Sequence, residues 1–265
     1  MRWSRLSADS HGVTWYRSGR SGSATWLRLA GSVRKRSEHI DILGGMGTPP
    51  QPRYRDREES RFYRARGLTP EATWQALGDE LARVLDDAQR AFWRTPLRID
   101  AERVRWWHGA IFARHFPHDG GHFRREPAFF GVVTPDGGTR QLAGADPLAI
   151  RRELAAVCAS FNSQVSADAD VDAASVLDRT RPVASLYAGI LRVHPFADGN
   201  HRTAFVALSA ALWSLGLPNV EFDEDDELTA HDQTLVPALS SKDGSAEPFA
   251  TLLAEHIEHS PRSQS

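Results

Sequence analysis

Residues 194–203 read HPFADGNHRT and separate two apolar segments with helical periodicity. Pro195 cannot continue the helix before it, so the chain must turn directly after His194 and leave that imidazole at a helix end. The Asp-Gly pair that follows forms a tight turn, and a new helix is expected to begin near Asn200. The N–H groups of a first helical turn and the positive end of the helix dipole attract anions. The stretch therefore predicts an anion-binding helix start beside a histidine.

The polar side chains of this stretch are those of phosphate chemistry. Arg202 carries a planar fork of donors that fits two phosphate oxygens at once. Asp198 offers a hard oxygen ligand of the kind that Mg²⁺ takes together with substrate phosphates. His194 can accept a proton from a hydroxyl at neutral pH, because the ordinary pKa of histidine lies near neutrality. A base, a metal ligand, a phosphate cradle and a charge clamp together predict a phosphoryl or nucleotidyl transfer site.

The same stretch closely resembles the signature of Fic domains, H-P-F-x-(D/E)-G-N-(G/K)-R. Six specified positions agree: His194, Pro195, Phe196, Gly199, Asn200 and Arg202. The resemblance covers residues 67–259 and implies a mainly α-helical Fic fold, a helical bundle with a β-hairpin flap near the active site. It also implies ATP as co-substrate, Mg²⁺ as the metal, and AMP transfer to a Ser, Thr or Tyr hydroxyl of a target protein. The chain would then be a protein adenylyltransferase.

The resemblance also implies a role for each position of the motif. His194 would be the general base that deprotonates the target hydroxyl, and Asp198 would hold Mg²⁺. Phe196 would anchor the loop in the core. The nucleotide-binding groups would come from four residues at the start of the next helix: Gly199, Asn200, His201 and Arg202.

Two positions depart from the usual family pattern. His201 stands where AMP-transferring members usually have glycine, and its Cβ and imidazole narrow the approach to a phosphate. Phe205 stands where a second arginine is usual. The run HRTAF at residues 201–205 is similar to the Doc branch of the superfamily, whose members have lysine at the first position and transfer phosphate. A Doc-like phosphotransferase, that is a protein kinase, and a degenerate module that binds nucleotide or peptide without chemistry are therefore alternatives.

The sequence also bears on how the activity is restrained. Many Fic proteins are inhibited by a glutamate in the motif (S/T)-x-x-x-E-(G/N), which pairs with the second arginine. Residues 251–256 read TLLAEH and match only the first part of that motif. With Phe205 in place of the arginine, Glu255 is interpreted as a solvated residue. If the activity is restrained, the inhibitory glutamate would come either from a helix of this chain or from a separate antitoxin, in which case the chain would be the toxin of a toxin–antitoxin pair.

Apolar periodicity predicts helices on both sides of the motif. One begins with Thr69 as N-cap and Pro70 at the first helical position, and a second begins at Asp100. A third begins with the pair Asp146–Pro147. A fourth leads into the motif, a fifth leaves it and stops at Gly216, and closing helices follow toward the C-terminus.

Residues 128–142, AFFGVVTPDGGTRQL, break the helical pattern. An aromatic and β-branched run followed by the turn TPDGG predicts a β-hairpin. A hairpin on a helical body has a strand edge that can pair with an extended peptide. By the resemblance, this hairpin would be the flap to which the target protein presents its hydroxyl side chain.

A cluster of four histidines precedes the hairpin: His108, His115, His118 and His122. No recognised zinc pattern accompanies them, so they are interpreted as polar positions around a helix end. His108 and Arg124 resemble residues that family members carry at corresponding positions, which would place Arg124 near the nucleotide.

Composition and charge give the wider setting. Hydrophobic residues make up 41% and charged residues 25% of the 265 residues, the range of a soluble globular protein. No apolar run is long enough to span a membrane, no secretory signal is present, and Cys158 is the single cysteine. These features lead us to expect a cytoplasmic protein without disulfides.

The domain boundaries follow from the change in pattern. We expect a basic N-terminal extension over 1–66, the Fic domain over 67–259 and a tail over 260–265. The extension has 14 Lys and Arg against 6 Asp and Glu. Its basic residues lack periodicity, so we do not expect nucleic-acid binding. TWYRSG and SATWLRLAG within it predict short strands, and the rest is interpreted as partly disordered or as preceding a translation start near Met46. The oligomeric state is left open.

Overall fold

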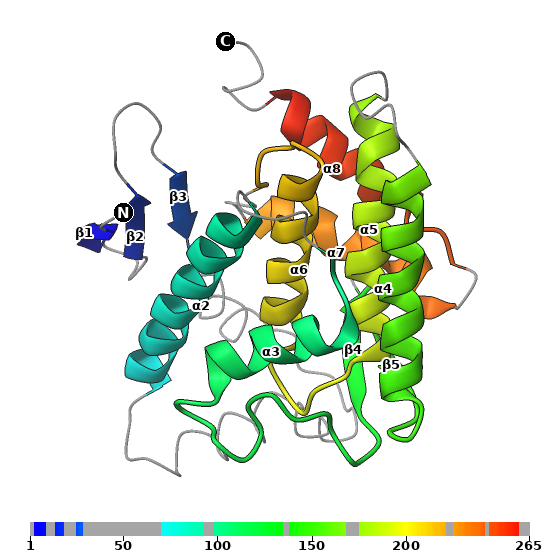
Figure 1. Cartoon of the computed structure of the whole chain (residues 1–265), viewed down its shortest axis with the longest axis horizontal. Helices are drawn as coiled ribbons and strands as arrows, with labels where there is room; N and C mark the ends of the chain where they lie inside the picture. Colours follow the sequence, from blue (N-terminus) through cyan, green and yellow to red (C-terminus); the bar gives the residue numbers. More distant parts are fainter. Residues whose placement is uncertain are drawn as a thin grey trace, which may run out of the picture. The chain divides into compact units, whose positions relative to one another are not determined.

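The computed structural model describes residues 3–8, 14–18, 25–28, 70–92, 98–134, 138–167, 175–220, 225–241 and 244–259. Within them lie seven helices: α2 (Pro70–Phe92), α3 (Ala101–Phe112), α4 (Ile150–Ala167), α5 (Val176–Val193), α6 (Asn200–Ser214), α7 (Asp225–Ser240) and α8 (Glu247–His259) (Figure 1). The prediction of a mainly α-helical fold is confirmed. None of these helices combines the length and the apolar character needed to cross a membrane.

Three short strands near the N-terminus form an antiparallel sheet of their own, in the order β1 (Trp3–Ala8), β2 (Thr14–Ser18) and β3 (Thr25–Arg28). The strands β2 and β3 were predicted, whereas β1 was not. The predicted linker, Met46 and the tail 260–265 lie outside the described residues. The chain divides into two compact units between Gly78 and Asp79, and every residue of the candidate site belongs to the second unit.

The helix α5 is the centre of the second unit and packs against α4, α6 and α8. In Figure 1 α4 and α5 run side by side. Its start is defined by Ser175, whose hydroxyl accepts the N–H of Asp178 at 3.1 Å and so satisfies one donor of the first turn. The C-terminal half of α5 is buried almost all round: Leu186, Tyr187, Ala188, Gly189, Ile190, Leu191 and Val193. This burial fixes the position of the C-terminal end of α5, where the motif begins.

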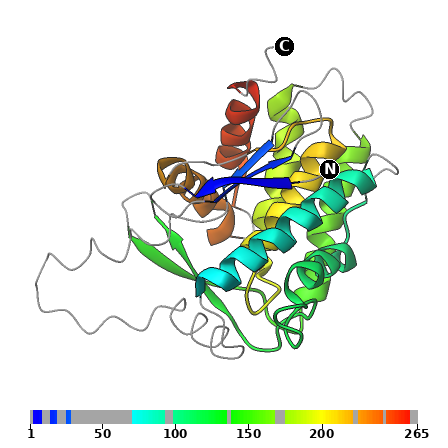
Figure 2. The same ribbon diagram turned by 90° about the vertical axis from the view of Figure 1, so that its left-hand side faces the viewer.

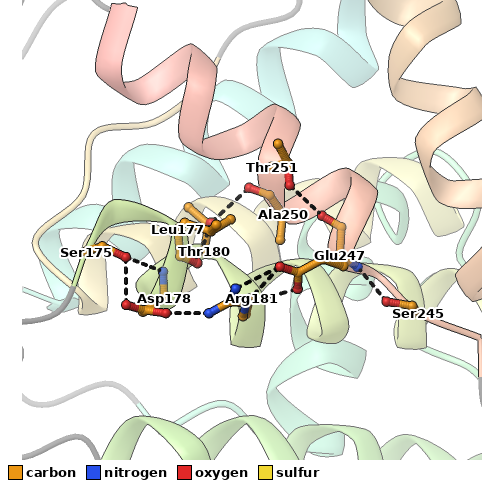
Figure 3. Close-up of polar contacts among 9 residues, drawn as sticks. All are labelled: Ser175, Leu177, Asp178, Thr180, Arg181, Ser245, Glu247, Ala250 and Thr251. Atoms are coloured by element: carbon orange, nitrogen blue, oxygen red, sulfur yellow. Dashed lines mark hydrogen bonds and ion pairs between the residues drawn. The ribbon is translucent and has the colours of Figure 1, made fainter.

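Polar contacts join the first half of α5 to α8 (Figure 3). The hydroxyl of Thr180 is buried and donates to the carbonyl of Ala250 at 2.9 Å. On the surface, Nε of Arg181 donates to both carboxylate oxygens of Glu247 at 3.0 Å. Thr180 precedes His194 by fourteen residues, or about 20 Å along a helix. The α8 junction therefore holds the end of α5 that is distant from the motif.

The helix boundaries near the site agree with the predictions except for α4. Asp100 caps α3 as predicted, with its carboxylate accepting the N–H of Arg103 at 2.7 Å. The helix α4 begins at Ile150 and not at the predicted pair Asp146–Pro147. The reason is a turn, in which the side chain of Asp146 accepts the N–H of Leu148 at 2.8 Å and forms an alternative to helix.

The predicted hairpin is confirmed. It consists of β4 (Phe129–Val133) and β5 (Thr139–Ala143), which pair antiparallel from Phe129 opposite Ala143 to Val133 opposite Thr139 (Figure 2). One face is buried through Phe130, Val132 and Leu142, whereas Phe129 on the other face is 55% exposed. This alternation is that of a strand with one face on the core.

Candidate active site

His194 ends α5 in a left-handed conformation. Its φ is 49° and its ψ is 60°, and its N–H donates to the carbonyl of Ile190 at 3.0 Å. The side chain is 6% exposed, and its ring stacks on the ring of Phe130 from β4, with centroids 4.6 Å apart and planes at 5°. The predicted general base thus lies between the end of α5 and the hairpin.

The imidazole of His194 is neutral in this environment. Burial first, and then the charges of His201 and Arg124, lower the pKa of His194 to about 3, while the carbonyl of Leu191 acts in the opposite direction. Nδ1 is buried, and no group in the described part of the chain forms a hydrogen bond of normal geometry with it. We therefore expect Nε2, and not the buried Nδ1, to accept a proton. A neutral ring at physiological pH is the form that a general base requires.

The loop between α5 and α6 is closed by the side chain of Asn200. The N–H of Phe196 donates to Oδ1 of Asn200, and Nδ2 of Asn200 donates to the carbonyl of Phe196, both at 2.9 Å. The predicted anchoring role of Phe196 is confirmed by its complete burial. The amide of Asn200 therefore shapes the loop, so any contact of Asn200 with nucleotide would come from its main-chain N–H.

Gly199 is the N-cap of α6 and has no room for a side chain. Its φ is 74°, a conformation that favours glycine, and an added Cβ would lie 2.3 Å from the ring of Phe112. The N–H of Thr203 donates to the carbonyl of Gly199 at 3.0 Å and closes the first helical turn. The N–H groups of Asn200–Arg202 precede that bond, in the part of a helix that binds anions.

His108 supports the same loop from α3 and is the one buried member of the predicted histidine cluster. Nδ1 accepts the N–H of Gly121 at 2.9 Å, so Nε2 carries the proton and donates to the carbonyl of Asp198 at 3.0 Å. The ring stacks on Phe196, with centroids 3.8 Å apart. Burial lowers the pKa of His108 to about 4, which keeps this tautomer neutral. His108 therefore holds the turn that carries Asp198.

Three polar side chains of the motif reach solvent. His201 is exposed, and Asp198 and Arg202 are partly exposed. The guanidinium of Arg202 lies over the ring of Phe112, 5.9 Å from its centroid. These are the positions at which the predicted phosphate and metal contacts would have to be made.

Asp198 fits a magnesium ion that is held mostly by phosphates. Its Oδ1 accepts the N–H of Gly199 at 2.5 Å, which orients the carboxylate and leaves Oδ2 as a ligand. The described residues contain no group of three or more His, Cys, Asp or Glu side chains arranged to hold a metal. Mg²⁺ is commonly bound by one or two carboxylates together with substrate phosphates, so a single carboxylate suits it.

The structure also gives the positions of Phe205 and Glu255, which bear on how the site is regulated. Phe205 is partly buried on α6, at the position where a second arginine is usual. Glu255 is exposed on α8, as predicted. No acidic side chain of α8 is among the groups that shift the pKa of His194.

Sequence reasoning missed three contributions to the site. Phe112 forms the wall against Gly199, and Phe130 stacks on His194. Arg124, expected near the nucleotide, is buried and donates from Nε to the carbonyl of His194 at 2.6 Å. The spacing of four between His108 and Phe112 was a local signal, because such residues share one face of a helix. The other two contacts join residues that are far apart in the sequence.

Comparisons with known proteins agree with this geometry. Residues 98–212 match the model of the Fic/DOC family. An N-terminal Fic domain of a putative cell filamentation protein from Bartonella quintana, solved with bound ADP, is 20% identical with a TM-score of 0.52, over 72% of this chain and 87% of that one. A Fic domain-containing signalling protein from Bacteroides thetaiotaomicron is 18% identical with a TM-score of 0.51, over 76% and 75%.

A fragment of Fic-1 from C. elegans is 19% identical with a TM-score of 0.50. The match covers 77% of this chain but only 56% of the Fic-1 fragment. No curated protein sequence matches the chain. The predicted Fic fold is thus confirmed by solved structures, and the family match spans α3, the hairpin, α4, α5 and most of α6. Residues 98–212 therefore correspond to the Fic/DOC family model, and the solved structures show the same fold.

Proposed function

We propose that this chain transfers a nucleotide monophosphate, AMP from Mg·ATP, to the hydroxyl of a Ser, Thr or Tyr side chain on a target protein. Members of the Fic family transfer nucleotide monophosphates to proteins. The observation that carries the proposal is the buried imidazole of His194, which ends α5 six residues before α6 begins at Asn200, where the first N–H groups of a helix can bind anions. Base and phosphate cradle thereby occupy one loop.

The residues of this chain would divide the reaction as follows. Nε2 of His194 takes the proton of the target hydroxyl, the hydroxyl oxygen bonds to the α-phosphorus, and pyrophosphate leaves. The first turn of α6 and Arg202 receive the negative charge of the phosphates. That charge also raises the pKa of the His194 imidazole, because it opposes the effect of the neighbouring cations. Nucleotide binding would therefore bring the base closer to its working range.

ATP and Mg²⁺ are the proposed co-substrate and cofactor. The similar domain from Bartonella quintana was solved with bound ADP, which supports nucleotide binding by this fold. Asp198 would hold Mg²⁺ through the carboxylate oxygen that Gly199 leaves available. When bound, the ion neutralises charge on the phosphates.

The hairpin β4–β5 is the proposed docking element for the target. Both of its strands have an unpaired edge within the described part of the sheet, since the sheet has two strands only. Phe130 joins the hairpin to His194 through ring stacking, so a segment paired with the hairpin edge would lie near the base. This arrangement supports a target that presents its hydroxyl on an extended segment.

Phosphate transfer of the Doc type is the second candidate. It is favoured by His201, which is exposed in the first turn of α6 and can place a positive charge where the Doc branch has lysine. The two reactions differ in which phosphorus the hydroxyl attacks. The position of the label in ATP therefore separates them.

The test is label transfer from ATP to cellular proteins in a lysate treated with the purified chain and Mg²⁺. ATP labelled at the α-phosphate is expected to label a target band, and ATP labelled at the γ-phosphate is not. The His194→Ala variant should give neither band while still binding ATP. Labelling from γ-phosphate alone would replace the proposal by phosphate transfer. Nucleotide binding without any label would favour the degenerate module.

Restraint by a separate antitoxin protein forms part of the proposal. Glu255 is exposed on α8, and Phe205 replaces the arginine with which an inhibitory glutamate pairs. The Glu255→Gln variant is therefore expected to label targets at the same rate as the unaltered chain. A clear increase in rate would mean that α8 itself restrains the site.

A further inference from the structure

Arg124 lies in the connection between α3 and β4 and is 7% exposed. A guanidinium removed from water costs free energy unless its donors are satisfied. Its side chain donates to four main-chain carbonyl oxygens: those of His194 at 2.6 Å, Glu126 at 2.7 Å, Ala145 at 2.5 Å and Val193 at 3.4 Å. The acceptors come from three separate segments of the chain.

Two of these acceptors are at the C-terminal end of α5. Val193 is the last residue of the helix, and His194 is its C-cap. Carbonyl oxygens there carry the negative end of the helix dipole and lack partners within the helix. The cation of Arg124 therefore stabilises this helix end in the manner of a basic residue in a last helical turn.

The other two acceptors are the two feet of the hairpin. Glu126 precedes β4 and Ala145 follows β5. Main-chain bonds reinforce the same junction: the N–H of Arg124 donates to the carbonyl of Pro195 at 3.0 Å, and that of Ala145 to the carbonyl of Val193 at 3.1 Å. One side chain thus ties both feet of the hairpin to the helix end that bears His194.

The junction is tightly packed around His194. At Gly144, beside Ala145, an added Cβ would lie 2.7 Å from Nη2 of Arg124 and 2.9 Å from Cβ of His194. On the hairpin, Phe130 stacks on the imidazole. Arg124, Gly144 and Phe130 therefore all pack closely against His194.

The conformation of His194 needs such support. A left-handed φ is unfavourable for a residue with a Cβ relative to the right-handed form, and it persists only where the surroundings determine it. The bond from Nε of Arg124 fixes the orientation of the His194 carbonyl, and with it the direction of the side chain.

We propose that Arg124 is a positioning residue for His194, which fixes the main chain from which the imidazole projects and couples it to the feet of the hairpin. The inference rests on the proposed function in one respect only, that His194 is the general base. Arg124 does not contact the reacting atoms in this role. It acts through the geometry of His194.

The test compares Arg124→Gln and Arg124→Lys with a matched control, Arg83→Gln. Arg83 likewise donates to a main-chain carbonyl, that of Ala110 at 3.1 Å, but outside the site. The readout is the pair of imidazole ¹⁵N shifts of His194, assigned by their loss in His194→Ala, with the shifts of His108 as an internal reference. Affinity for ATP and, where transfer occurs, kcat and KM for ATP are measured on the same proteins.

We expect Arg124→Gln to move the His194 shifts toward those of a solvated ring while the His108 shifts and ATP affinity stay unchanged. The kcat should fall roughly tenfold to a hundredfold with little change in KM, since a misplaced group loses that much. Lysine keeps the positive charge of Arg124 but not its planar set of donors. The His194 shifts and the kcat of Arg124→Lys should therefore stay close to those of Arg124→Gln. Arg83→Gln should change none of these values.

Unchanged His194 shifts in folded Arg124→Gln would overturn the inference. If Arg124→Gln does not fold, the same measurements are made on Arg124→Lys. Full activity and unchanged His194 shifts in Arg124→Lys would then overturn the inference. The shifts do not depend on transfer. A chain that transfers nothing would therefore refute the proposed function and still leave the role of Arg124 decided.

Discussion

At the scale of single residues, the site depends on a histidine in an uncommon backbone conformation. His194 is the one residue other than glycine with positive φ among the described residues. Strain of this kind persists at functional sites, where the surroundings determine the conformation. Its neighbours then remove the ring from water and keep it neutral. The same backbone that ends α5 therefore also sets the position and the burial of the proposed base.

From the turn that leads into α6 we predict that Gly199→Ala lowers the free energy of unfolding more than Gly216→Ala does. Both glycines have positive φ, 74° and 69°, but an added Cβ at Gly199 would lie 2.3 Å from Phe112, whereas at Gly216 nothing lies within 4 Å. Conformational cost alone is about 1 kcal/mol, and the clash adds about 1 to 3 kcal/mol. Urea unfolding of both variants measures the difference. Equal losses would show that the Phe112 ring moves away without cost.

The two buried imidazoles predict a loss of stability in mild acid. The pKa values of His108 and His194 are lowered to about 4 and about 3, against 6.5 in the unfolded chain. Between pH 6.5 and 4 the unfolded state therefore binds more protons, so the free energy of unfolding falls as pH falls. Each ring contributes up to about 1.4 kcal/mol per pH unit in this window, and the effect ends below the folded pKa values.

Urea unfolding at a series of pH values from 7 to 5 checks this expectation. His108→Gln should lower the pH slope by about one proton, because one buried imidazole is removed. The control His118→Gln changes an exposed ring of the same histidine cluster and should preserve the slope. A slope that His108→Gln leaves unaltered would show that His108 is already protonated in the folded state.

At the scale of elements, α5 connects two junctions of different character. Its C-terminal end meets the hairpin through Arg124 and His194, and its first half meets α8 through a buried hydroxyl and a surface ion pair (Figure 3). The periodicity of apolar residues predicted both helices. It did not predict the junctions, because a hydroxyl and a guanidinium in a helical sequence do not reveal which distant carbonyl they meet.

The α8 junction predicts that Thr180→Val destabilises the chain more than Glu247→Gln. Valine keeps the shape of the buried threonine but leaves the Ala250 carbonyl without this donor, at a cost of about 1 to 3 kcal/mol. Glu247 is exposed, and water and salt screen its pair with Arg181. Thermal unfolding of the two variants checks the order. A larger loss of stability in Glu247→Gln would show that the surface ion pair, and not the buried hydroxyl, contributes most to the junction.

At the scale of the whole molecule, local patterns predicted the helices, the hairpin and the motif, and tertiary contacts explain the rest. The start of α4 was placed too early because Asp146 caps a turn as well as a helix. Asn200 was expected among the nucleotide-binding residues, and the bonds by which its side chain closes the loop were not predicted. His108 and Arg124 reach the motif over 90 and 70 residues of sequence, and no local signal specifies partners at that separation.

The central claim is that His194 is the base for transfer of a nucleotide monophosphate. The most direct measurement is the intact mass of a target protein, identified by α-phosphate labelling, after incubation with Mg·ATP and either the unaltered chain or His194→Ala. The account predicts a gain of one AMP with the unaltered chain and no gain with His194→Ala, while both bind ATP equally. An AMP gain that survives in His194→Ala, or a gain of one phosphate instead of AMP, would contradict it.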